Sequence, residues 1–308
     1  MRALVTGGAG FIGSNLADAL AAAGHQVAVL DNFYSGRREN LTGHQLFELD
    51  VRDRQGIEAA FEEFRPELVF HLAAQIDVRN SVGDPVFDAD VNVLGALNIL
   101  EAARKTEVTK FIYGSTAGAV FGNPEYLPVD EAHPVKPLCP YGASKHAFEP
   151  YLHMYGVNYG LRYTIIRFPN VFGPRQDPHG EAGVIAIFTD RMVRGAKCTI
   201  FGDGTSTRDY LYVGDIVAAN LLAIEKGDGQ VYNLGWGIEV SVKEVFAALV
   251  KATGYQGEPE YAPARLGEVY RIAINSAKAQ RELGWQPTVG LEEGLRLTVA
   301  HIRASEQS

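Results

Sequence analysis

The stretch Arg2-Ala-Leu-Val-Thr-Gly7-Gly-Ala-Gly10-Phe-Ile-Gly13 places a short apolar run directly before three spaced glycines. An apolar run followed by this glycine spacing predicts a buried strand, a tight turn and the start of a helix, the context in which glycine loops bind dinucleotides. Gly7 permits the turn, Gly10 lets the backbone approach a pyrophosphate, and Gly13 lets the helix pack closely on the sheet. Phe11 and Ile12 follow at the N-terminus of the helix.

Asp31 follows the second predicted strand, 18 residues after Gly13. A carboxylate at this position hydrogen-bonds a ribose hydroxyl and repels a 2′-phosphate, so NAD is favoured over NADP. Arg37 and Arg38 leave an alternative open, because they could hold a phosphate there. Asp50 and Val51 are expected to close a third strand near the adenine.

The first 170 residues alternate short apolar runs with stretches of helical periodicity. Buried strands are predicted over residues 3–5, 26–30, 68–70, 110–113 and 163–166. Helices are predicted over residues 11–23, 54–64, 91–106 and 141–159. This alternation predicts an α/β fold with a Rossmann-like, doubly wound parallel sheet.

The composition changes after about Phe172, beginning with a loop-like segment over residues 173–180. A strand is predicted over residues 198–201, and helices over 184–194, 213–226 (starting near Asp215), 242–253 and 291–304. We expect a dinucleotide-binding domain over residues 1–170 and a smaller C-terminal α/β lobe over residues 171–308. Part of this lobe is expected to return to the first sheet.

Composition and charge narrow the classes of protein to consider. The net charge of −9 disfavours nucleic-acid and anionic-membrane partners. No apolar run is long enough to cross a bilayer, and the first strand starts too early for a signal peptide. Two cysteines are too few for a disulfide framework, which favours a cytoplasmic protein. The eight histidines and the cysteines show no ligand spacing, so no metal site is expected.

Tyr141 and Lys145 are four residues apart in a predicted helix and therefore share one face of it. A lysine ammonium favours the anionic form of a neighbouring tyrosine, which turns a weak phenolic acid into a base. With a dinucleotide site upstream, the pair predicts hydride transfer assisted by a general base. The alternative is that both are ordinary exposed helix residues.

The glycine spacing combined with Tyr-x-x-x-Lys resembles the extended short-chain dehydrogenase/reductase family, and within it the nucleotide-sugar epimerases. Matching stretches cover nearly the whole chain and include His71-Leu-Ala-Ala-Gln75, Pro140-Tyr-Gly-Ala-Ser-Lys145 and Arg167-Phe-Pro-Asn170. In the resemblance, the NAD site is lined by Asp31, Asn32, Ser35, Gly36, Asp50, Val51, Leu72, Ala73, Ala74, Asn92, Ser115, Tyr141, Lys145 and Phe168.

The family also uses a serine or threonine beside the tyrosine, three residues before the valine of a Val-Tyr-Gly motif. Counting back from Val120 reaches Ala117, which has no hydroxyl. We expect Thr116 to take this role, with Ser115 or water as the alternatives. The family's 4,6-dehydratases need an acid and a carboxylate base beside this position. Here Gly118 and Ala119 follow instead, which disfavours elimination of water.

The resemblance also predicts a substrate site in the crevice before and within the second lobe. Asn170, Arg208 and Arg265 would hold a pyrophosphate, the arginines through their forks of donors. Further contacts to phosphate and uracil are expected from Gly183, Val184, Thr199 and Phe201. Ile272 matches the position that limits the 2-substituent of the sugar, although it could equally be an ordinary strand residue.

The resemblance therefore implies an NAD-dependent epimerase acting at C4 of a UDP-hexose through a transient 4-keto sugar, with UDP-galactose and UDP-glucose favoured. Alternatives are a 4-epimerase of a UDP-uronic acid or UDP-N-acetylhexosamine, and a catalytically silent NAD sensor. The helices over 91–106 and 141–159 could pair with a second copy, which is the homodimer usual in the family.

Overall fold

The computed structural model describes residues 1–179, 183–264 and 269–305. Seven parallel strands form its central sheet in the order β11-β6-β5-β4-β1-β2-β3. The order runs outward in both directions from β1 and β4, so the predicted doubly wound α/β fold is confirmed. The strands are β1 (Arg2–Thr6), β2 (Gln26–Asp31), β3 (Gln45–Glu48), β4 (Leu68–His71), β5 (Lys110–Thr116), β6 (Arg162–Phe168) and β11 (Gln230–Asn233).

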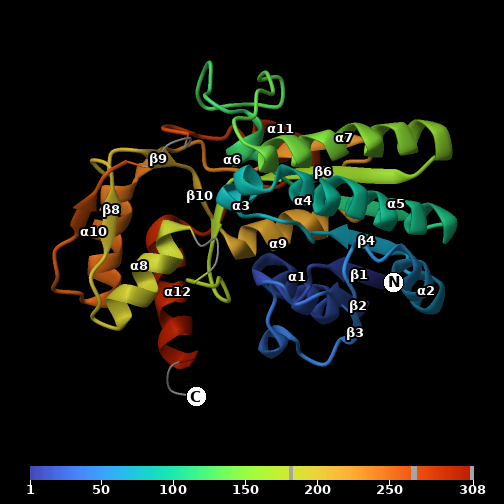
Figure 1. The fold of residues 1–308 in the computed structure, drawn as a ribbon, viewed down its shortest axis with the longest axis horizontal. Coiled ribbons are helices and arrows are strands. Elements are labelled where there is room, and N and C mark those ends of the chain that lie inside the picture. Colours follow the sequence, from blue (N-terminus) through green and yellow to red (C-terminus); the bar gives the residue numbers. More distant parts are fainter. Residues whose placement is uncertain (180–182, 265–268, 306–308) are drawn as a thin grey trace.

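Helices cover both faces of this sheet (Figure 1). One face carries α1 (Phe11–Ala22), α9 (Val213–Leu222) and α11 (Ala277–Leu283). The other carries α2 (Arg54–Phe64), α5 (Ala96–Lys105) and α7 (Pro140–Tyr159). Alternate residues of one strand serve the two cores, since Ala3 and Val5 pack on the first face and Leu4 on the second. This two-sided burial explains the continuous apolar runs in the sequence.

The C-terminal half supplies β11 and α9 to the sheet and builds a separate small core. In Figure 1 that core lies at the left, around three helices. They are α8 (Val184–Val193), α10 (Val242–Thr253) and α12 (Leu291–Ser305). Short strands pair beside them: β7 (Asn170–Phe172) with β10 (Tyr210–Tyr212), β8 (Thr199–Phe201) with β13 (Glu260–Ala262), and β9 (Thr207–Arg208) with β12 (Val240–Ser241).

Several predicted boundaries were wrong. The third strand ends at Glu48, two residues before Asp50, and β8 begins at Thr199 instead of Cys198. Residues 91–106 are not one α-helix, because a π-helical turn, η2 (Asp90–Gly95), precedes α5. The helix expected near Asp215 starts at Val213 and ends at Leu222, because the glycine-rich residues 225–229 turn the chain.

Short elements between the main ones were not predicted from periodicity. They are η1 (Arg38–Asn40), α3 (Val78–Gly83), α4 (Pro85–Ala89) and α6 (Ala117–Val120). Aspartates cap two of them, since Asp77 accepts a hydrogen bond from the backbone of Asn80 and Asp84 from that of Phe87. Among the described residues, no helix is both long and apolar enough to cross a membrane.

Candidate active site

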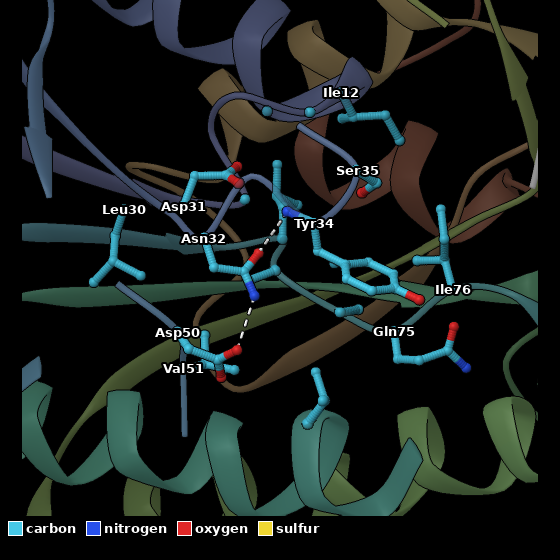
Figure 2. A pocket seen from close by; sticks show the side chains of 18 of the residues that line it. Ile12, Leu30, Asp31, Asn32, Tyr34, Ser35, Asp50, Val51, Gln75 and Ile76 are labelled. Carbon is cyan, nitrogen blue, oxygen red and sulfur yellow. Dashed lines mark hydrogen bonds between the residues drawn. The ribbon is translucent and has the colours of Figure 1, made fainter. Parts of the chain in front are cut away.

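A cavity of about 250 Å³ lies at the carboxyl ends of β1, β2, β4 and β5. Figure 2 shows side chains from several of these strand ends converging on it. Of the residues expected to hold NAD, it is lined by Gly7, Gly10, Phe11, Ile12, Gly13, Asp31, Asn32, Ser35, Asp50, Val51, Leu72, Ala73, Ala74, Ser115, Tyr141, Lys145 and Phe168. Gly36 and Asn92 lie just behind this lining, where Gly36 packs against the Asp31 carboxylate and Asn92 is buried.

The glycine loop has the backbone geometry that lets a phosphate-bearing cofactor come close to the start of α1. Gly7 has a φ of +68°, and a Cβ there would meet the backbone nitrogen of Ala73 at 2.8 Å. A Cβ on Gly13 would lie 2.1 Å from the carbonyl oxygen of Gly7, so any larger residue would push helix and loop apart. The first turn of α1 carries no acidic side chain, and Gly10 has no side chain to cap it. Its amides therefore suit an anionic pyrophosphate.

Asp31 is held in place by the backbone around it. One carboxylate oxygen accepts from the backbone nitrogen of Ala9 at 2.9 Å and the other from that of Phe33 at 2.8 Å. Burial raises the pKa of Asp31, and these two hydrogen bonds oppose the shift. Each oxygen keeps a second lone pair, which suits it to accept from ribose hydroxyls.

Asn32 and Asp50 form the adjoining wall, where Figure 2 shows Asn32 bridging two neighbours. Its side chain donates to Asp50 at 2.8 Å and accepts from the backbone nitrogen of Tyr34 at 3.0 Å. Hydrogen bonds from Arg52 lower the pKa of Asp50 to about 2. The cavity wall next to the predicted adenine site therefore contains the ionised carboxylate of Asp50, which these hydrogen bonds hold in position.

Arg37 and Arg38 are both engaged by carboxylates. Arg37 pairs with Asp177 at 2.8 Å, while Arg38 pairs with Glu48 and covers the ring of Phe33. These contacts disfavour the alternative in which the two arginines hold a 2′-phosphate.

Tyr141 and Lys145 reach the same cavity from the first turns of α7. Lys145 is 3% exposed, and its Nζ lies 4.3 Å from the centre of the Tyr113 ring. Burial lowers the pKa of Lys145 to about 7, against the opposing charges of Glu149 and Asp88. The Tyr113 hydroxyl donates to the carbonyl of Lys145 at 3.3 Å, which braces this turn of the helix.

The hydroxyl-bearing strand β5 ends beside the pair. Ser115 lines the cavity, and Thr116 is nearly buried at the last strand position. A Cβ built on Gly118 would lie 3.8 Å from the Thr116 hydroxyl oxygen and 3.7 Å from the side-chain oxygen of Asn170. Thr116 and Asn170 therefore flank one small space, while Ala117 is buried in an apolar cluster.

The other expected substrate residues lie on the short strands and on α8. Arg208, at the end of β9, is two residues from Tyr210, the register partner of Asn170. Gly183 and Val184 begin α8, and Thr199 and the exposed Phe201 lie on β8. Arg265 lies outside the described residues. Ile272 is 1% exposed within the Ala117 cluster, which favours its interpretation as a packing residue.

Sequence reasoning missed several residues of this site. Tyr34, Arg52, Gln75 and Ile76 line the cavity from positions next to predicted ones, so extending each strand end by a few residues would have found them. Phe87 and Val91 reach the cavity from helices that periodicity did not delimit. Glu149 was missed although it stands one helical turn after Lys145, on the same face of α7.

Comparison with known proteins shows the family of this chain. Residues 3–235 match the model of the NAD dependent epimerase/dehydratase family, and the chain belongs to that family. It is 47% identical over 314 residues to the UDP-glucose 4-epimerase of Mycolicibacterium smegmatis, covering all of both chains.

Solved structures give the same result. The UDP-glucose 4-epimerase of Thermotoga maritima, crystallised with UDP-glucose, is 49% identical with a TM-score of 0.98, covering 99% of this chain and 100% of that one. The Thermus thermophilus UDP-glucose 4-epimerase in complex with NAD is 48% identical with a TM-score of 0.94, at the same coverage. The predicted family, fold and cofactor are thereby confirmed: the chain is an NAD-dependent enzyme.

Proposed function

We propose that this chain catalyses NAD-dependent epimerisation at C4 of a UDP-hexose, interconverting UDP-galactose and UDP-glucose through a transient 4-keto sugar. The observation that carries the proposal is the single cavity lined by the Tyr141–Lys145 pair, the glycine loop and Asp31. Full-length likeness to enzymes named UDP-glucose 4-epimerase supports the same reaction.

The positions of the side chains support the following assignment of catalytic roles. Tyr141 removes the proton from the sugar O4 and later returns it. Lys145 provides the adjacent cation that favours tyrosinate and holds the nicotinamide ribose, and Thr116 donates a hydrogen bond to the reacting oxygen. NAD, when bound, supplies the hydride acceptor for C4 and gives the hydride back. Asp31, Asn32, Ser35 and Asp50 hold the adenosine half of the cofactor.

The substrate diphosphate is assigned to Asn170, Arg208 and Arg265, and the uridine to the start of α8 and to β8. Asn170 supports this assignment because it adjoins the same small space as Thr116. Gly118 and Ala119 offer no acid or carboxylate beside Thr116, which favours return of the hydride over elimination of water. The sugar can then turn about its fixed diphosphate and receive hydride on its other face.

We divide the chain into an NAD-binding domain, residues 1–170, and a nucleotide-sugar lobe, residues 171–308, from which α9 and β11 return to the sheet. We further propose a homodimer formed through residues 91–106, which span η2 and α5, and through α7. Leu94 on η2 and Met154 and Val157 on α7 are exposed large hydrophobic residues, which supports an interface there. The free cysteines Cys139 and Cys198 support a cytoplasmic location.

The decisive experiment incubates the purified protein with a panel of UDP-sugars and no added reductant. We expect UDP-galactose and UDP-glucose to reach the same equilibrium mixture from either side. Faster conversion of a UDP-uronic acid or UDP-N-acetylhexosamine would reassign the substrate. NAD binding without conversion of any sugar would mark the chain as a silent sensor.

A further inference from the structure

Glu149 connects three elements, α7, β5 and β6, and the first two of these carry the proposed catalytic side chains. It lies on α7, one turn after Lys145, and its residue is 5% exposed. Its carboxylate accepts from the Ser115 hydroxyl of β5 at 2.8 Å and from Arg167 Nε of β6 at 2.9 Å. A second contact to Arg167 and one from His146 Nδ1 at 2.9 Å complete its partners.

The hydrogen bond from Ser115 to Glu149 gives the two hydroxyls at the end of β5, those of Ser115 and Thr116, different hydrogen-bonding roles. A serine has a single hydroxyl proton, and that of Ser115 points to Glu149. Burial disfavours the ionised carboxyl, but hydrogen bonds from Arg167, His146 and Ser115 hold the pKa of Glu149 at about 2. Because the acceptor is a carboxylate, Ser115 presents only lone pairs to the cavity. Thr116 is left as the hydroxyl donor to the sugar oxygen.

Titratable groups from several elements surround Lys145. Glu149 and Asp88, the latter on α4, both favour its ammonium form. Burial lowers the pKa of the neighbouring His71, on β4, to about 3, so this imidazole is neutral. The ring of Tyr113 stacks on the ring of His71. Arg167 opposes Glu149, so the pair is neutral as a whole. Removing only the glutamate charge would leave the buried guanidinium of Arg167 without its counter-charge.

We propose that Glu149 is a positioning residue for proton transfer: it fixes Ser115 as an acceptor and supplies the negative charge that keeps Lys145 cationic beside Tyr141. This inference rests on the proposed epimerase reaction, because its readout is the pH dependence of that reaction. Glu149 does not touch the cavity, so its effect on catalysis passes through Ser115 and Lys145.

The test compares Glu149→Gln with the unchanged protein. Loss of the negative charge lowers the pKa of neighbouring acids, so the profile of kcat against pH should move to lower pH by roughly one unit. At a fixed pH on the alkaline limb this corresponds to a rate ~10-fold lower. Bound NAD and the KM for UDP-galactose should stay the same, since no cavity residue changes. A purely structural role would lower the melting temperature without moving the pH profile.

Two further variants sharpen the result. Glu149→Asp keeps the charge, so its pH profile should match that of the unchanged protein even if stability falls. Glu101→Gln is the matched control, because Glu101 also contacts α7, through Tyr155, but far along the helix, and its profile should not move. If Glu149→Gln does not fold, Arg167→Gln provides the test instead. Because this variant removes a positive charge, its profile of kcat against pH should move to higher pH.

The outcomes distinguish this inference from the proposed function. An unchanged protein that converts no UDP-sugar contradicts the epimerase reaction itself. An active protein whose glutamine variant keeps the original pH profile contradicts only the role of Glu149. The role of Glu149 is supported if the pH profile of Glu149→Gln moves to lower pH while that of Glu149→Asp matches the profile of the unchanged protein.

Discussion

The cofactor cavity and the proposed substrate face of this molecule are built in different ways. The cavity collects residues from the carboxyl ends of adjacent strands in one parallel sheet. The proposed substrate face comprises Asn170, Arg208 and Thr199, which lie on three separate pairs of short strands. A sheet edge gathers successive sequence motifs in a fixed order, whereas each short pair depends on a partner remote in the sequence. Local sequence motifs therefore predict the cofactor cavity, but they do not predict the proposed substrate face.

The largest expected effect is at Tyr141, the proposed base, which lines the cofactor cavity. Tyr141→Phe removes the proton acceptor and should lower kcat for UDP-galactose by ~10²–10⁴-fold, the usual worth of general base catalysis. Bound NAD, measured from the absorbance of the denatured protein's supernatant, should be unchanged. Tyr151→Phe is the control, since Tyr151 is exposed on the same helix. A fully active Tyr141→Phe enzyme would remove the tyrosine from the mechanism.

Asp31→Asn probes the cofactor region alone. Charge-assisted hydrogen bonds contribute about 1.5–3 kcal/mol, so NAD affinity should fall roughly 10–100-fold. Titration calorimetry on the apoprotein measures this, with no change expected in the binding of UDP. Asp53→Asn is the control, because Asp53 only caps α2. Equal NAD affinity in the Asp31 variant would contradict the ribose contact.

Arg208→Ala probes the substrate face alone. Loss of one arginine contact to the diphosphate should raise the KM for UDP-galactose about 10-fold, while NAD content stays the same. Arg271→Ala is a matched control, since Arg271 is an exposed arginine paired with Glu239 and should behave like the unchanged protein. If the Arg208 variant loses NAD instead, the two regions are not separable as argued.

Lys145→Met should be inactive yet more stable without ligands. Burial lowers the pKa of Lys145 to about 7 from its ordinary 10.5, so the folded protein gives up this proton before the unfolded chain does. Below pH 7 the full free-energy cost of burying the Lys145 ammonium destabilises the folded protein. This cost decreases as the pH rises towards 10.5. At pH 7, the variant should gain ~1–2 kcal/mol in free energy of unfolding, and the gain should shrink at higher pH. Urea titrations at several pH values measure it, and a less stable variant would refute the claim.

The same contrast explains which parts of the structure the sequence could predict. Gly7, Gly13 and Asp31 are recognisable because their functions depend on spacing along one βαβ unit. The pairing of Arg37 with Asp177 joins residues from the two halves of the chain, and no local pattern indicates it. Burial of Ile272 likewise depends on the remote bridge between Val129 and Ile274. Glu149 was within reach of helical periodicity, but its partners on β5 and β6 were not.

The most direct test of the account follows the hydrogen on C4. UDP-galactose carrying deuterium at C4 is incubated with the purified protein, and the UDP-glucose formed is analysed by mass spectrometry and NMR. In the proposed reaction the hydride passes from C4 to bound NAD and returns to C4, so we expect the product to keep its deuterium at C4 without exchange with water. UDP-glucose carrying solvent hydrogen at C4 would contradict the account.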